Sequence, residues 1–224
     1  MKTKLLIIGA FAFVLGFSAC QTKTSKTGAD DTSSVMSDST HMGMGTAMGS
    51  GMMGARQMMM DNMHSMQMTG NVDHDFAMMM ISHHQGAIDM AKAELSSGQD
   101  DSLKQMAQKM ITNQEAEQKE LQQIIDSYKN PVKSYDPAKK DAGFAKVMDQ
   151  NMTMMMDMPK ADETRNTDQQ FANMMIPHHQ SAIFMSEGYI KHGKDPKLLS
   201  MAKKMISDQQ KEIEDLKKWN DSHP

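Results

Sequence analysis

The chain has 224 residues, with 24 Lys and Arg against 28 Asp and Glu, which gives a formal net charge of −4. This balance excludes nucleic-acid binders that rely on clustered positive charge, and an aromatic content of 5% leaves few side chains on which bases could stack. A single cysteine excludes a disulfide framework and a cysteine-based zinc finger. The 30 methionines exceed what an ordinary core needs, so we expect the function to lie in methionine chemistry.

Residues 1–19 are typical of a secretory signal peptide. Two lysines precede a short apolar run, and small residues stand directly before the only cysteine, Cys20. This pattern resembles a bacterial lipobox, in which the cysteine is acylated and becomes the mature N-terminus. The alternative is a plain signal peptide with a chance cysteine. We favour the lipid anchor, because an unpaired thiol is a liability in an exported protein. The prediction is therefore an exported cell-envelope lipoprotein that faces the periplasm and is tethered to the membrane.

Residues 20–57 are expected to form a flexible tether. The segment 21–40 is polar and lacks apolar periodicity. The stretch 41–54, HMGMGTAMGSGMMG, contains five glycines, which oppose a stable helix. Methionines in this stretch have little apolar sequence to pack with, so they are either exposed metal ligands or loosely packed on the folded domain. We favour ligands, and the candidates in and after this stretch are His41, Met42, Met44, Met59, Met60, Met63 and His64.

The rest of the chain is an internal duplication. A shift of 95 residues places 75–121 on 170–216 without a gap, and 22 of these 47 positions are identical. Each copy is predicted to be a pair of helices joined by a short link that contains a glycine, Gly98 or Gly193. The predicted N-caps are Asp73 and Asp168 for the first helices and Asp100 and Asp195 for the second helices.

Apolar spacing supports these helices and sets the predicted fold. Apolar residues recur at helical spacing in both helices of the first copy, for example at Phe76, Met80 and Leu121. Pro177 is expected to kink the third helix or to separate its first turns. We place the first pair in 58–130, a connecting segment with some helix in 131–157, and the second pair in 158–224. No segment alternates as a strand does, so the prediction is an all-α four-helix bundle.

A histidine doublet occurs at the same place in each copy. Adjacent residues diverge by 100° on a helix, so a doublet cannot chelate one ion as two residues spaced i and i+4 can. Methionines stand at that spacing before every histidine. A single histidine on an apolar face is usually a core residue, but the repetition of doublet and methionines favours metal ligation. The candidate ligands are His83, His84, His178, His179, Met79, Met80, Met174 and Met175.

Methionine and histidine together suit a soft metal. A thioether is a ligand for Cu(I) or Ag(I), and an imidazole accepts both oxidation states of copper. Methionine also forms no disulfides in an oxidising compartment. The alternative is that methionine only fills irregular core space, which explains Met106, Met110, Met201 and Met205 well. It explains the runs 58–60, 78–80 and 154–156 poorly, because three consecutive residues sweep about 200° of a helix and at least one should approach solvent.

Polar residues interrupt the apolar stripe of each second helix. Gln114 and Glu117 recur as Gln209 and Glu212. A buried glutamate is costly unless it is paired, so each should meet a histidine or a metal, unless this face is exposed. A carboxylate could fix the tautomer of a ligating histidine or bind the metal directly. These four residues, with Met90 and Met185, are the alternative or supporting ligands.

The doublet segments carry a family resemblance. MMMISHHQGAIDMA at 78–91 and MMIPHHQSAIFMS at 174–186, each followed by Q-x-x-E, resemble the signature of the domain of unknown function 305 family. The resemblance covers about 73–220. It implies a ferritin-like helical bundle and the copper binding and copper tolerance of the family's periplasmic members. Ser82 stands where the second copy has Pro177, and Gly86 where it has Ser181, so the two sites are expected to differ in affinity.

Three functions are compatible with these patterns. The leading prediction is a membrane-tethered protein without catalytic activity that binds copper, and potentially silver, for sequestration, tolerance or transfer. Copper-exporting or copper-accepting envelope proteins would then be its partners. The second is a ferritin-like metal oxidase, although the E-x-x-H motif of such enzymes is absent from both copies. The third is a metal-free interaction module that uses adaptable methionine surfaces.

Overall fold

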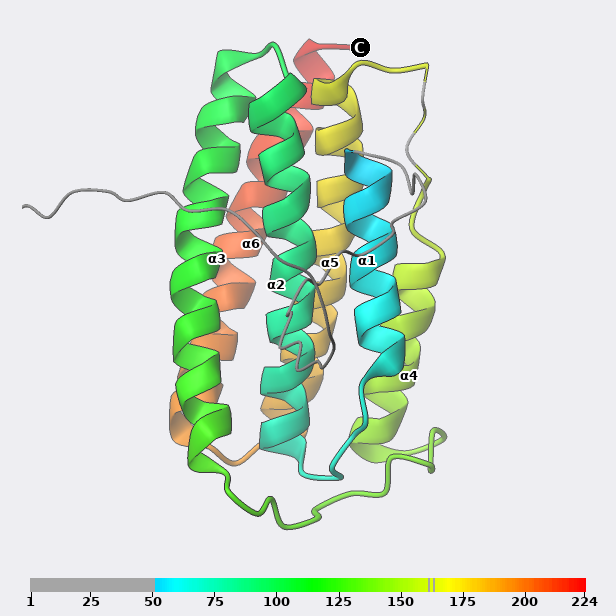
Figure 1. Cartoon of the computed structure of the whole chain (residues 1–224), viewed down its shortest axis with the longest axis vertical. Helices are drawn as coiled ribbons and strands as arrows, with labels where there is room; N and C mark the ends of the chain where they lie inside the picture. Colours follow the sequence, from blue (N-terminus) through cyan, green and yellow to red (C-terminus); the bar gives the residue numbers. More distant parts are fainter. Residues whose placement is uncertain (1–50, 161, 163) are drawn as a thin grey trace, which may run out of the picture. The chain divides into compact units, whose positions relative to one another are not determined.

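The computed structural model describes residues 51–160, 162 and 164–224, and these residues form six α-helices and no strand. The all-α prediction is therefore confirmed (Figure 1). All of these residues belong to the second of two compact units, which spans Gly45–Pro224. None of the described helices is long and apolar enough to cross a membrane. The helices are α1 (Met52–Ser65), α2 (Val72–Ser97), α3 (Asp101–Ser127), α4 (Gly143–Met156), α5 (Thr167–His192) and α6 (Pro196–Ser222).

The four long helices form the predicted bundle of two duplicated pairs. Helix α2 packs on α3, and α5 packs on α6, while α2 and α5 contact each other and join the pairs. The shorter helices are additional to the prediction of four. Helix α1 lies along α2, and α4 lies along α5, so each pair carries one extra helix (Figure 1).

Helix starts agree with the prediction for α3 and α6 and differ for α2 and α5. Asp100 and Asp195 cap α3 and α6 through their carboxylates. Helices α2 and α5 begin two residues earlier than predicted, because the amide oxygens of Asn71 and Asn166 accept the capping hydrogen bonds. The carboxylate of Asp168 instead accepts hydrogen bonds from the backbone N–H groups of Gln99 and Asp100, both at 2.9 Å. The predicted cap role of Asp73 and Asp168 was wrong, and these residues bind the opposite inter-helix link.

Pro177 does not divide the third long helix. Helix α5 runs without interruption over Thr167–His192 with the proline inside it. A proline removes one backbone hydrogen bond and costs about 3 kcal/mol in a helix interior. Because Met174 and Met175 before it and His178 and His179 after it are all buried, packing outweighs that cost.

The helical part begins within the stretch that was expected to be a tether. Helix α1 starts at Met52, before the predicted boundary at residue 57. Four of its methionines, Met52, Met59, Met60 and Met63, are buried, and Met59 lies over Gly86 of α2. Burial of this face outweighs the low helix propensity of glycine. Residues 1–50, with the signal peptide, Cys20 and most of the tether, lie outside the described part of the chain.

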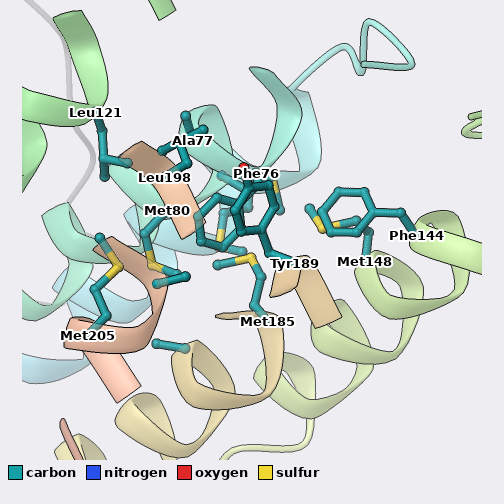
Figure 2. Packing of buried hydrophobic residues seen from close by; sticks show 14 of the residues in the cluster. Phe76, Ala77, Met80, Leu121, Phe144, Met148, Met185, Tyr189, Leu198 and Met205 are labelled. Atoms are coloured by element: carbon teal, nitrogen blue, oxygen red, sulfur yellow. The ribbon is translucent and has the colours of Figure 1, made fainter. Parts of the chain in front are cut away.

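The core consists of two hydrophobic clusters, one toward each end of the bundle. One contains Phe76, which stacks on Tyr189 with ring centroids 4.0 Å apart and planes 13° apart. Methionine side chains, including Met80 and Met185, surround this pair (Figure 2). The other cluster contains Leu103 and Leu216 at the opposite end. Between the two clusters, every long helix carries buried polar side chains, among them His83 on α2, Gln114 on α3, His178 on α5 and Gln209 on α6.

Candidate metal centre

A polar layer separates the two core clusters. It lies at the middle of the bundle, because on α2 one cluster ends at Met80 and the other begins at Ala87. The same interruption recurs on the other three long helices. The members that the sequence predicted are the two histidine doublets and the Q-x-x-E residues, and the structure brings all of them to this level: His83, His84, Gln114, Glu117, His178, His179, Gln209 and Glu212.

The two histidines of each doublet face different partners. His83 on α2 and His178 on α5 lie against each other, with ring centroids 3.8 Å apart. His84 instead points to α3, where its Nε2 lies 2.9 Å from Oε2 of Glu117. His179 points to α6 and reaches Oε2 of Glu212 at 2.8 Å. Of the two partners expected for each glutamate, a histidine or a metal, the structure provides the histidine. The 100° between neighbours explains why one histidine joins the pairs while the other binds within its own pair.

Carboxylate acceptors place a proton on one nitrogen of two imidazoles. A carboxylate only accepts hydrogen bonds, so His84 and His179 each carry a proton on Nε2. Nε2 of His83 lies 2.7 Å from the hydroxyl of Ser181, which also lies 2.9 Å from the backbone carbonyl of His178 and 2.7 Å from Sδ of Met155. In the neutral form of His84 and His179, the lone pair is therefore on Nδ1.

These Nδ1 atoms have no partner in the described structure. Nδ1 of His83, His84, His178 and His179 is buried without a hydrogen bond, and so is Nε2 of His178. The four side chains are at most 1% exposed. A buried acceptor without a donor costs about 1–3 kcal/mol. Four such atoms in one layer suit a metal ion, since ligating histidines commonly bind metal with one nitrogen and donate to an oxygen with the other.

Burial keeps the central pair of histidines neutral. It is the main reason that the pKa of His83 and that of His178 lie well below the ordinary value, and the neighbouring histidines lower them further. Burial alone would raise the pKa of Glu117, but hydrogen bonds from His84 and Lys204 outweigh it and hold that pKa below its ordinary value. Neutral imidazoles beside an ionised carboxylate are the forms that bind metal.

The two copies of the layer differ in charge compensation. Nζ of Lys204 lies 3.1 Å from Oε1 of Glu117. The residue equivalent to Lys204 in the first copy is Lys109, and no ion pair joins it to Glu212 in the described structure. Glu117 is therefore neutralised from the α6 side, whereas among the described residues Glu212 has a hydrogen bond with His179 and no ion pair with a lysine. The difference in affinity expected for the two copies stays a prediction.

The predicted methionine ligands line the two sides of the layer. Met79, Met80, Met174 and Met175 are buried one helical turn before the histidines. Long side chains on a helix lean toward its N-terminus, so each histidine leans toward the turn that holds its methionine. The two pairs end in different clusters, with Met79 and Met80 at one end and Met174 and Met175 at the other.

Sequence reasoning missed Ser181 and Met155. The hydroxyl of Ser181 contacts His83 and lies 2.7 Å from Sδ of Met155 on α4. Met155 is fully buried, while Met154 and Met156 on either side are 37% and 51% exposed. This exposure confirms that part of the methionine run reaches solvent. Ser181 was visible as a departure from Gly86, but only the packing of α4 on α5 shows what its hydroxyl contacts.

The alternative ligands lie either in the polar layer or in the core clusters beside it. Gln114 and Gln209 lie in the layer with Oε1 buried and without a partner. Met90 and Met185 are buried in opposite clusters, and the amide of Asn151 approaches Sδ of Met185 at 3.8 Å. Within the described residues, no three His, Cys, Asp or Glu side chains are already arranged to hold one metal ion. A metal in this layer would therefore need methionine sulfur or a change of side-chain rotamer.

The methionine-tract candidates fall into two groups. Met59, Met60 and Met63 are core residues of α1, at most 5% exposed, whereas His64 is exposed. His41, Met42 and Met44 lie outside the described residues. The tract is thus divided by the start of α1, and its metal-binding role stays a prediction.

Solved structures of a copper protein resemble this chain. CopM in an Ag-bound form, obtained by soaking, is 30% identical over 70% of this chain and 98% of its own, with a TM-score of 0.51. The Cu(I)-bound form has the same identity and coverage with a TM-score of 0.50. The Cu(II)-bound form is 29% identical over 68% of this chain and 98% of its own, with a TM-score of 0.50.

Sequence comparison finds a viral relative and a family. The uncharacterized protein L153 of Acanthamoeba polyphaga mimivirus is 43% identical over 49 residues, which are 22% of this chain and 32% of the viral protein. The match thus spans about a third of that relative. The family described as "Domain of unknown function (DUF305)" matches twice, over residues 19–125 and 119–220, in agreement with the duplication. The chain therefore belongs to the DUF305 family.

Proposed function

We propose that this protein binds copper, and that the polar layer between the two core clusters is its principal site. Neutral Nδ1 atoms of His83, His84 and His179 and the thioethers one turn before them are the ligands in this proposal. His178, which lies against His83 in the same layer, completes the donor set. The bound ion would be Cu(I) or Cu(II), and Ag(I) would compete for the sulfur-rich positions.

The observation that carries the proposal is the set of buried imidazole nitrogens without partners. A layer built only for packing would pair them or replace them with apolar side chains, because each unpaired atom is costly. Instead, an oxygen atom lies within hydrogen-bond distance of Nε2 of His83, His84 and His179, and Nδ1 of each ring is buried without a hydrogen bond. The resemblance to CopM structures with Ag, Cu(I) and Cu(II) supports copper rather than another soft metal.

In this proposal the protein sequesters copper or passes it on in the cell envelope and catalyses no reaction. The lipobox-like segment before Cys20 supports attachment to a membrane through an N-terminal lipid. A tethered copper carrier would exchange metal with copper-exporting or copper-accepting envelope proteins. Its methionines suit that exchange, because thioether ligands carry no proton that must be released on binding.

The test is competition between the protein and a Cu(I) chelator of known affinity, without oxygen. The full chain should hold Cu(I), and a variant with His83→Gln and His178→Gln should hold it at least ten-fold more weakly, by about 1.4 kcal/mol or more. Glutamine keeps a polar side chain of moderate size, and circular dichroism would verify that the variant remains helical. The matched control is His192→Gln with His223→Gln, which alters two exposed histidines outside the layer.

Equal Cu(I) affinity of the folded double variant and the wild type would contradict the proposal. Metal analysis of the purified chain adds a second criterion. About two equivalents of iron, with no copper uptake, would instead favour the ferritin-like oxidase.

A further inference from the structure

A second set of sulfur donors lines a cavity beside helix α4. The cavity has a volume of about 230 Å³ and lies among residues of α1, α2, α4 and the segment that precedes α4. Methionines dominate its lining: Met63, Met68, Met79, Met148, Met152 and Met156. Figure 2 shows Met148 on α4 next to Phe144, at the edge of the packed core.

The methionines that line the cavity range from exposed to fully buried. Met156 is 51% exposed, Met148 is 7% exposed, and Met79 is 1% exposed. A protein interior normally leaves few voids larger than a water molecule. The methionines that line this cavity, both exposed and buried, therefore differ from those packed tightly around Phe76 and Tyr189.

A histidine nitrogen is available at the same cavity. Nδ1 of His64 lies 2.9 Å from the backbone carbonyl of Met60. A carbonyl can only accept, so the proton is on Nδ1 and the lone pair is on Nε2. His64 is exposed and belongs to the lining of the cavity. The carbonyl that orients this ring thus leaves its outer nitrogen free to bind a metal.

The charges at the cavity compensate each other. Asp149, the carboxylate of the lining, forms an ion pair with Lys140 at 2.9 Å. The phenol of Tyr135 donates to Asp75 at 2.8 Å. The hydroxyl of Thr153 donates to the backbone carbonyl of Asp149. The remaining donors are thioethers and one imidazole, which suit a soft monovalent ion better than oxygen-bound Mg²⁺ or Ca²⁺.

We propose that this cavity is a separate, solvent-accessible binding site for Cu(I) or Ag(I), with methionine sulfurs and Nε2 of His64 as ligands. The choice of metal rests on the copper-binding function proposed above, but the donor set shares only Met79 with the histidine layer. Met79 connects the two sites, because it forms the inner wall of the cavity and stands one helical turn before His83. A metal bound in the cavity is therefore next to the buried layer.

The experiment is an Ag(I) titration of the full chain labelled with ¹³C at the methionine methyl groups. Ag(I) is diamagnetic and shifts the methyl signal of each methionine that binds it. We expect the signals of Met63, Met148 and Met152 to shift. A variant with Met148→Leu and Met152→Leu should bind about one Ag(I) fewer per chain in competition with a chelator, since leucine keeps the volume and removes the sulfur. The matched control is Met201→Leu with Met205→Leu, one half-buried and one buried residue on α6.

The outcomes separate the two proposals. Loss of bound metal in the Met148 and Met152 variant, but not in the α6 control, supports the cavity site even if the variants of His83 and His178 bind normally. Unchanged binding by the Met148 and Met152 variant, with unmoved methyl signals, overturns the cavity site and leaves the histidine layer untouched. A wild-type chain that binds neither Ag(I) nor Cu(I) overturns both.

Discussion

Substitution of Glu94 by glutamine should change how the stability of the protein depends on pH. Glu94 is fully buried at the end of α2, and no N–H group reaches its carboxyl oxygens. Burial and the neighbouring Asp168 carboxyl group raise the pKa of Glu94 to about 8. Asp168 is engaged by two backbone N–H groups of the α2–α3 link. A proton on Glu94 therefore lets the two carboxyl groups hydrogen-bond instead of repelling each other.

The pKa sets the sign and size of the effect. In the unfolded chain Glu94 loses its proton near its ordinary pKa of 4.5, whereas in the folded protein it keeps the proton up to about 8. The folded state thus binds more protons between these values, and its stability falls as pH rises through this range. The full difference corresponds to at most about 5 kcal/mol, at about 1.4 kcal/mol per pH unit. Glutamine carries a permanent donor and removes this dependence.

Urea unfolding of the metal-free protein, followed by circular dichroism from pH 5 to 9, measures the effect. The stability of E94Q minus that of the wild type should increase steadily with pH and level off above pH 8. The second copy supplies a natural comparison, because Tyr189 occupies the equivalent position and donates its phenol to Asp73 at 2.7 Å. Tyr189→Phe should lower stability by about 1 kcal/mol, with no change between pH 5 and 8. A difference between E94Q and wild type that is constant with pH would refute the reasoning.

Three further predictions concern the layer, the packing of α1 and the anchor. The lowered pKa values of His83 and His178 mean that the unfolded chain takes up protons first, so metal-free stability should fall below pH 6.5 by up to about 3 kcal/mol per pH unit. Replacing both with glutamine should flatten that slope in the same urea assay, and an unchanged slope would argue against the buried neutral pair. Gly86→Ala should lower stability by about 1–3 kcal/mol, because the added Cβ would lie 2.4 Å from Sδ of Met59. A thermal melt checks it, and an unaltered melting temperature would mean that α1 does not pack there. Cys20→Ser should release the protein from membranes without altering copper affinity, which fractionation measures; firm membrane association of this variant would contradict the lipid anchor.

The sequence predicted the bundle and its polar residues because duplication, periodicity and charge are visible in one dimension. The 95-residue repeat indicated two helical pairs, and Q-x-x-E on an apolar stripe indicated that Glu117 and Glu212 meet a histidine or a metal, and they meet histidines. Sequence spacing could not predict which residue each histidine contacts. His83 and His178 meet only because α2 packs on α5, which no local spacing encodes.

Helix α1 shows the limit of helix propensity as a predictor. Glycines in 41–54 argue against a helix, yet Met52 begins one, because Met52, Met59 and Met63 are buried by tertiary packing. Asp73 and Asp168 show a related limit. A carboxylate near a helix start can satisfy N–H groups of its own helix or of another segment, and only the fold decides between them.

Anomalous diffraction at the copper absorption edge, from crystals of the full chain loaded with Cu(I), would test the central claim most directly. The account predicts an anomalous peak in the polar layer, in contact with Nδ1 of at least one of His83, His84 and His179 and with a methionine sulfur. Copper confined to other parts of the molecule, with these Nδ1 atoms still unbound, would contradict it.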